Sequence, residues 1–139
     1  MLPFRAPALT DREAAEKCAA AYHYPLCEHC FVDLFIWQGH YHTQICFYEG
    51  FLLIKMTPPD GKHDLYLAPI GTGDLRSAIQ ALQADAAEQG IPFVMVSVPE
   101  DMLPRLEEAM PNTFSYSWNE DGADYIYLSE KLQTLSGKK

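Results

Sequence analysis

The sequence predicts an α/β domain built on one mixed sheet with helices on both of its faces. Residues 65–67, 68–74 and 75–89 read as a strand, a glycine turn and a helix whose apolar residues recur with helical spacing. The run at 51–54 is apolar at every position, which is typical of a strand buried on both faces. Because a helix separates the strand at 65–67 from the apolar run at 92–98, these two strands are expected to be parallel.

Two helices are expected before the sheet. Thr10 and Glu13 have the spacing of a capping box with Thr10 as the N-cap, and the helix they open is expected to end before Pro25. The second helix is expected over residues 28–38 and to end at Gly39. Apolar residues occur on both of its sides, so we expect it to be buried more widely than a surface helix. These residues are Phe31, Leu34 and Phe35 on the inner side and Val32, Ile36 and Trp37 on the outer side.

A three-stranded meander is expected next. The strand-like runs at 45–48 and 51–54 flank Glu49-Gly50, a two-residue hairpin connection, and the third strand is expected at 63–67. Residues 2–5 are predicted to form a short edge strand, because the proline among them disfavours a central position.

The remaining elements follow the helix at 75–89. Gly90 is expected to cap that helix in a left-handed conformation, and Pro99 is expected in the first turn of a further helix. Two strands are predicted at 114–118 and 125–128, followed by a linker or tail at 130–139. The inner face of the helix after Pro99 is expected to comprise Met102, Leu103, Leu106 and Met110.

Charge and composition exclude several classes of function. The chain has 19 acidic and 10 basic residues, a formal net charge of −9, which disfavours nucleic-acid binding by this chain alone. No apolar run is long enough to span a bilayer, and the N-terminus lacks the pattern of a signal peptide. We therefore expect no transmembrane segment and a cytoplasmic protein, whose four cysteines are free thiols rather than disulfides.

The sequence contains one motif typical of zinc sites. Cys27 and Cys30 are spaced so that two thiolates can face one ion, and His23, His40 and His42 lie nearby in the sequence. A second ligand pair at a recognised spacing is missing, so we predict buried free cysteines at a helix start rather than a metal site.

The element order, with its glycine turn, resembles the GNAT acyltransferase fold. The chain also resembles, over nearly its whole length, a bacterial family of unknown function related to the C-terminal domain of phosphatidylglycerol lysyltransferases. Residues 119–128 and the closing segment 135–139 carry this resemblance most specifically, and residues 50–54, Cys27 and residues 31–37 also fit it.

The resemblance implies a tandem arrangement. Residues 1–129 are expected to form one GNAT-like domain, and residues 130–139 a linker or tail that in the family leads into a second, more basic GNAT-like domain. This chain is then an N-terminal half, from a truncated tandem protein or an expressed fragment. Its expected partner is a second GNAT-like domain in cis or a homodimer partner. Aromatic residues that such a partner would cover are Phe47, Tyr48, Phe51, Trp37 and Trp118.

The glycine turn is the candidate cofactor-binding segment. In GNAT enzymes a Gln/Arg-x-x-Gly-x-Gly/Ala turn holds the pyrophosphate of acyl-CoA on backbone N–H groups at a helix start. Gly71 and Gly73 match this pattern, whereas Ala68 occupies the Gln/Arg position. The residues that would bind acetyl-CoA or another acyl-CoA are Gly71, Thr72, Gly73 and Asp74. The alternative is an ordinary tight turn in which Asp74 caps the helix and competes with phosphate for its N–H groups.

The resemblance transfers no catalytic residue by motif. A tyrosine is often proposed as the general acid of GNAT enzymes, and Tyr116, Tyr125 and Tyr127 lie on or near the last predicted strands. Alternation of Tyr125 and Tyr127 with apolar residues is equally typical of a half-buried strand, and we favour that structural interpretation.

Three hypotheses of function remain open. The chain is a non-catalytic or partly catalytic N-terminal half of an acyl- or aminoacyl-transferase-type protein. Alternatively it is a stand-alone acetyl-CoA-dependent N-acetyltransferase, or a catalytically silent interaction or regulatory module. If it is an enzyme, it is an acyltransferase in which an amine or hydroxyl attacks an activated carbonyl, assisted by positioning and oxyanion stabilisation.

Overall fold

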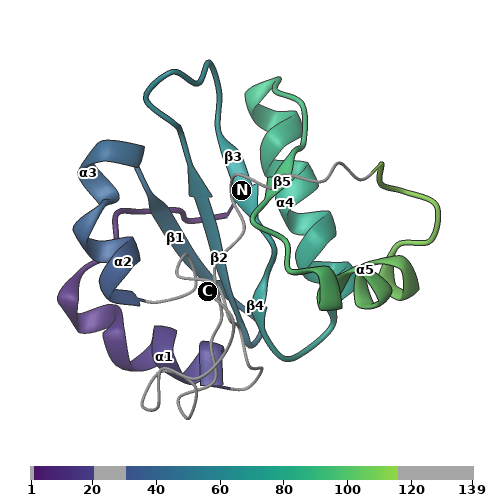
Figure 1. Ribbon diagram of the computed structural model, residues 1–139, viewed down its shortest axis with the longest axis horizontal. Coiled ribbons are helices and arrows are strands. Elements are labelled where there is room, and N and C mark those ends of the chain that lie inside the picture. Colours follow the sequence, from purple (N-terminus) through teal and green to yellow (C-terminus); the bar gives the residue numbers. More distant parts are fainter. Residues whose placement is uncertain (1, 21–30, 116–139) are drawn as a thin grey trace, which may run out of the picture.

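A five-stranded mixed sheet forms the centre of the protein (Figure 1). The computed structural model describes residues 2–20 and 31–115. The strands lie in the order β1-β2-β3-β5, and β4 pairs with β2. All pairs are antiparallel except β3 and β5, which are parallel, so the predicted mixed sheet and its parallel pair are confirmed. The strands are β1 (Gln44–Tyr48), β2 (Phe51–Met56), β3 (Leu65–Leu67), β4 (Ile70–Gly71) and β5 (Met95–Val96).

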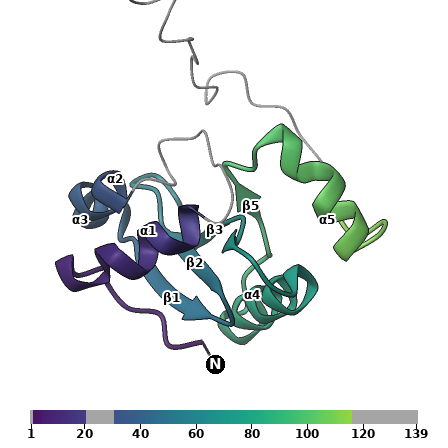
Figure 2. The same ribbon diagram turned by 90° about the horizontal axis from the view of Figure 1, so that it is seen from below.

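Helices lie on both faces of this sheet, as predicted from the sequence (Figure 2). Helices α1 and α2 pack on one face, and α4 covers the other face with α5 beside it. The helical elements are η1 (Leu9–Asp11), α1 (Arg12–Ala20), α2 (Phe31–Ile36), α3 (Gln38–Tyr41), α4 (Leu75–Gln89), η3 (Glu100–Met102) and α5 (Leu103–Ala109).

The side chains of β2 belong to two separate hydrophobic cores. Leu52 and Ile54 pack with α1 and α2, whereas Phe51 and Leu53 pack with α4 and α5. Successive residues of a strand point to opposite faces, so an uninterrupted apolar run fills both cores at once. The apolar run predicted a strand covered on both faces, and that prediction is confirmed.

The predicted hairpin and the caps of the long helix are also confirmed. Glu49 (φ 43°) and Gly50 (φ 88°) both have positive φ, as a two-residue type I′ connection requires. Asp74 caps the N-terminus of α4 by accepting a hydrogen bond from the backbone N–H of Ser77. Gly90 ends α4 in the left-handed conformation with φ 70°.

The predicted N-cap at Thr10 is wrong. The helical segment begins two residues earlier than predicted, as the 3₁₀ turn η1 with Ala8 at its N-cap position. The Asp11 carboxylate accepts a hydrogen bond from the backbone N–H of Ala8 at 2.8 Å and pairs with the Arg5 guanidinium. The aspartate outcompetes the threonine because its ionised carboxylate satisfies a backbone donor and an arginine together.

The helix predicted over residues 28–38 is divided, and its first three residues lie outside the described residues. In the described residues α2 ends at Ile36, α3 follows, and Gly39 lies inside α3 instead of ending the helix. His42, with φ 48°, ends α3. The inner stripe is correct, since Phe31 and Leu34 are buried. The outer side is not buried as predicted, because Val32, Ile36 and Trp37 are 47%, 66% and 48% exposed.

Several strands differ in extent from their predictions. The third strand begins at Leu65, and the run at 92–98 contributes only β5. Arg5 makes a single antiparallel bridge with Ile45, so residues 2–5 touch the sheet edge without forming a full strand. Of the aromatic residues expected to form an exposed face, Phe47 is 37% exposed, whereas Phe51 is buried. Residues 116–118, the strand predicted at 125–128 and the tail at 130–139 lie outside the described residues.

Candidate functional site

The glycine turn proposed as a cofactor site packs directly against the β1–β2 hairpin. Gly71 belongs to β4, a strand that was not predicted from the sequence, and it pairs with Phe51 of β2. Gly71 and Gly73 have φ values of 140° and 146°, which L side chains rarely adopt. A Cβ atom added at Gly71 would lie 2.2 Å from the Gly50 carbonyl oxygen, and one added at Gly73 would lie 2.8 Å from the Glu49 carbonyl oxygen. Backbone conformation and close packing therefore explain both glycines.

Polar groups of this turn already have partners within the fold. The backbone N–H of Thr72 donates to the Gly50 carbonyl oxygen at 3.4 Å. The Asp74 carboxylate accepts from the Ser77 N–H at 3.3 Å, and the Asp74 carbonyl accepts from the Ala78 N–H. Thr72, Gly73 and Asp74 are exposed at the start of α4. A phosphate approaching this helix start would meet the carboxylate of its cap.

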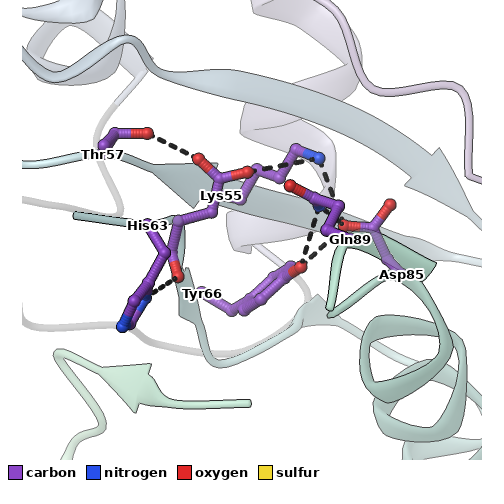
Figure 3. A network of polar contacts seen from close by, with 7 residues as sticks. Lys55, Thr57, His63, Tyr66, Asp85 and Gln89 are labelled. Carbon is purple, nitrogen blue, oxygen red and sulfur yellow. Dashed lines mark hydrogen bonds and ion pairs between the residues drawn. The ribbon is translucent and has the colours of Figure 1, made fainter. Parts of the chain in front are cut away.

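A buried polar network on the opposite end of α4 was not predicted. One carboxylate oxygen of Asp85 accepts hydrogen bonds from the Tyr66 hydroxyl at 2.7 Å, the Gln89 amide at 2.8 Å and the Lys55 ammonium at 3.1 Å (Figure 3). The Asp85 and Lys55 side chains are only 5% and 9% exposed. The network joins β2 and β3 to the last turns of α4.

Lys55 has two further neighbours. Its ammonium lies 3.6 Å from the Asp64 carboxylate, which also accepts a hydrogen bond from the Thr57 hydroxyl (Figure 3). The ammonium also lies 4.4 Å from the centre of the Phe4 ring. Two carboxylates and an aromatic face together compensate a charge that is largely removed from water.

Within this network the Tyr66 hydroxyl acts as a fixed hydrogen-bond donor to Asp85. Burial and the adjacent Asp85 carboxylate raise the pKa of Tyr66 far above its ordinary value, so the phenol keeps its proton. Tyr66 is fully buried, which suits it to bracing the helix rather than to contacting a substrate. Two features of the sequence could have indicated this network. Lys55 directly follows an apolar strand run, and Asp85 lies within the apolar helix next to Ala86.

The other candidate residues are only partly described. Cys27, Cys30, His23 and the tyrosines at 116, 125 and 127 lie outside the described residues, so the motif-based predictions for them stay predictions. His40 is described, and its ring packs edge-on against Tyr41 with ring centroids 4.8 Å apart. Within residues 2–20 and 31–115, no group of three or more His, Cys, Asp or Glu side chains is placed to hold a metal ion.

Comparison with known proteins places the chain in a family. The family described as "Phosphatidylglycerol lysyltransferase, C-terminal" matches residues 20–139. The chain belongs to this family. The resemblance to relatives of phosphatidylglycerol lysyltransferases is thereby confirmed, and no curated protein matches the chain.

A solved structure from Bacteroides thetaiotaomicron VPI-5482 is also similar to this member of the family. It is described as a conserved protein of unknown function, and it matches with 33% sequence identity and a TM-score of 0.86. The match covers 99% of this chain and 46% of that protein, so the chain spans less than half of its solved relative. Among the described residues, no helix is both long enough and apolar enough to cross a membrane.

Proposed function

We propose that this chain is the N-terminal half of a tandem GNAT-like protein of the acyl- or aminoacyl-transferase type. On its own this half is non-catalytic or only partly catalytic. The observation that carries the proposal is the extent of the structural match, which covers nearly all of this chain but 46% of the relative. A unit whose described residues form a two-sided core, and which corresponds to about half of a longer relative, is best explained as one domain of two.

The family description indicates the chemistry of the complete protein. Its name refers to transfer of a lysyl group to phosphatidylglycerol, a lipid that carries free hydroxyls. In such a transfer a hydroxyl oxygen attacks the activated carbonyl carbon, a new ester bond forms, the bond to the leaving group breaks, and the leaving group takes up a proton in place of the one that the hydroxyl loses. This half would supply the scaffold and part of the substrate wall, while the second domain or a homodimer partner would complete the site.

The glycine turn supports a structural contribution of this half. Both glycines are required by the packing of the Glu49-Gly50 turn, and Asp74 places a negative charge where a pyrophosphate would bind. These contacts favour the half-module over the alternative, a stand-alone acetyl-CoA-dependent N-acetyltransferase that uses Gly71, Thr72, Gly73 and Asp74.

The mass of the native polypeptide tests the tandem proposal directly. An immunoblot of the source cells with an antibody against this chain is expected to show a band of about twice the mass of a 139-residue protein, in line with the 46% coverage. A band at the mass of the chain itself would contradict the tandem arrangement in cis. Size-exclusion chromatography with light scattering would then decide whether a homodimer takes its place.

Titration calorimetry with acetyl-CoA separates the half-module from the stand-alone enzyme. We expect no saturable binding to the isolated 139-residue chain. Should binding occur, Thr72→Glu and its neutral counterpart Thr72→Gln locate it, because Thr72 is exposed and needs no unusual backbone conformation. Weakened binding for Thr72→Glu alone would establish the turn as a phosphate site and the stand-alone acyltransferase as the better hypothesis.

The hypothesis that this chain is a catalytically silent interaction or regulatory module can be tested only in the complete protein. If this half contributes to the site, the two-domain protein should transfer lysyl groups more slowly when the surface of this half is changed without unfolding it. Ile36→Arg is one such change, because Ile36 is exposed. An unchanged transfer rate in a series of such surface variants would favour an interaction or regulatory module.

A further inference from the structure

A cavity of about 280 Å³ lies between one face of α4 and the segments around Leu2 and Tyr48. Residues 81, 84, 85 and 88 of α4 line it, at the spacing that places side chains on one face of a helix. Asp85 is the buried member of the lining, whereas the other lining residues are half-buried or exposed. The cavity therefore opens at the surface and borders one buried carboxylate. Its lining residues are Leu2, Tyr48, Ala81, Ala84, Asp85 and Glu88.

The two oxygens of the Asp85 carboxylate have different surroundings. Oδ2 accepts all three hydrogen bonds of the buried network. Within residues 2–20 and 31–115, Oδ1 accepts no hydrogen bond, and Figure 3 shows this oxygen pointing away from the three donors. Oδ1 is not enclosed by protein atoms, so it keeps contact with open space. Because Asp85 borders the cavity, Oδ1 is the acceptor that this side chain presents there.

The charges around the cavity favour a cation. The Lys55 ammonium is shared between two carboxylates, 3.1 Å from Asp85 and 3.6 Å from Asp64, so these three groups together carry a net negative charge. The lysine contacts Oδ2 and leaves Oδ1 without a donor. Glu88 at the same cavity and the net charge of −9 add a longer-range attraction for cations. A desolvated carboxylate oxygen is best satisfied by an ionised donor.

We propose that this cavity binds the ammonium group of a small primary amine, with Asp85 Oδ1 as the acceptor. The apolar part of the ligand would lie against Leu2, Ala81 and Ala84. Among the described residues no set of three or more His, Cys, Asp or Glu is placed to hold a metal ion, so an organic cation fits this lining better. The proposal does not depend on the tandem arrangement, because every residue that it uses belongs to this chain.

NMR titration of the isotope-labelled 139-residue chain with butylammonium tests the proposal. The matched probes are 1-butanol, which lacks the charge, and tetramethylammonium, which lacks the N–H donors; all three have the same number of non-hydrogen atoms. We expect saturable binding of butylammonium with a Kd on the order of 1 mM, because so small a ligand makes few contacts. The amide signals that shift should belong to residues around the cavity, 81–88 of α4. Both other probes should bind at least about tenfold more weakly.

Three results of this titration would overturn the proposal. Equal affinity for tetramethylammonium would show a general attraction of cations to an acidic protein. Equal affinity for 1-butanol would show that the carboxylate makes no contribution. Absence of saturable binding, or signal shifts confined to other parts of the chain, would show that the cavity is not a site.

Two alanines of the same helix locate the site on the protein. Ala84 lines the cavity and Ala87 does not, and both are exposed. Ala84→Leu narrows the cavity and should weaken butylammonium binding by about tenfold. Ala87→Leu adds the same side chain outside the cavity and should leave the Kd unchanged. Neither alanine belongs to the buried network, so both variants should fold. Wild-type affinity of Ala84→Leu, or equal weakening by the two substitutions, would refute the site.

Asp85→Asn tests the acceptor itself. The variant keeps the shape of the side chain and removes its charge, so it should bind butylammonium and 1-butanol with similar affinity. Circular dichroism shows whether this variant is folded, and the comparison of Ala84→Leu with Ala87→Leu decides the question if it is not. A folded Asp85→Asn protein that still prefers butylammonium about tenfold would contradict the proposed role of Oδ1.

Discussion

Removing the negative charge of Asp85 is expected to destabilise the protein strongly. Asp85→Asn keeps the size and shape of the side chain, so it changes charge and hydrogen bonding with little change in packing. In the native protein one carboxylate oxygen accepts three hydrogen bonds, from Lys55, Tyr66 and Gln89. The substitution leaves Lys55, whose side chain is 9% exposed in the native protein, with the Asp64 carboxylate 3.6 Å from its ammonium.

The magnitude follows from this geometry. Breaking one side of a buried ion pair costs about 3–5 kcal/mol, because the remaining charge stays desolvated. Asp64 and the Phe4 ring still compensate Lys55, so we expect the lower end, about 3 kcal/mol. Since domains of this size unfold with about 5–15 kcal/mol, the loss is a large part of the total.

Urea unfolding followed by circular dichroism measures the effect, and a double-mutant cycle isolates the pair. Lys55→Met removes the stranded charge, so the double variant Lys55→Met/Asp85→Asn should be more stable than the sum of the single losses by roughly 1–3 kcal/mol. Arg12→Gln is the control: Arg12 pairs with Glu16 on the surface, with side chains 62% and 54% exposed. It should cost less than about 0.5 kcal/mol.

Two results would refute this reasoning. A loss below about 0.5 kcal/mol for Asp85→Asn would mean that the pair is solvated like a surface pair. Strict additivity of the two single variants would mean that Lys55 and Asp85 do not interact in the folded protein.

Three further predictions concern the turn, the helix cap and an ion pair. Gly71→Ala should cost roughly 2 kcal/mol or more in urea unfolding because of its positive φ and the close Gly50 carbonyl, whereas Gly39→Ala, with open space around it, should stabilise α3 by several tenths of a kcal/mol. Asp74→Ala should lower the unfolding free energy by about 1 kcal/mol, and Asp74→Asn, which retains the cap, by much less. The Arg5 guanidinium lowers the pKa of Asp11, so the stability difference between wild type and Asp11→Asn should be full above the ordinary pKa of 3.8 and disappear as the pH falls through the lower folded value. A difference that grows on acidification would contradict this sign.

Local chemistry made the long helix and the hairpin predictable from the sequence. The apolar stripe of α4 repeats over four turns, and a capping aspartate and a left-handed glycine mark its two ends. The Glu49-Gly50 connection is similarly determined by two residues that both adopt positive φ. In each case the decisive interactions lie within a few residues along the chain.

Predictions failed where a tertiary contact decided between local alternatives. The sequence between Phe31 and Tyr41 is apolar on both sides, so periodicity could not show that its outer side is exposed. Strand β4 has only two residues, and it exists because Gly71 can approach the hairpin backbone. The choice of Asp11 over Thr10 depends on Arg5, which lies outside the helix pattern.

The ion pair of Lys55 and Asp85 shows how charged residues within two apolar patterns can indicate a contact between distant elements. Lys55 continues the alternation that places Leu53 in the core beside α4, and Asp85 lies three residues after Leu82 on the buried stripe of that helix. Taken alone, a charged residue in the alternation of β2 or in the stripe of α4 indicates that the apolar face ends there. Two opposite charges on facing elements predict each other, because neither can be buried alone. The pair therefore specifies how the C-terminal end of α4 sits against β2. Because α4 is one rigid helix, the same contact helps to set the position of its other end, where the glycine turn lies.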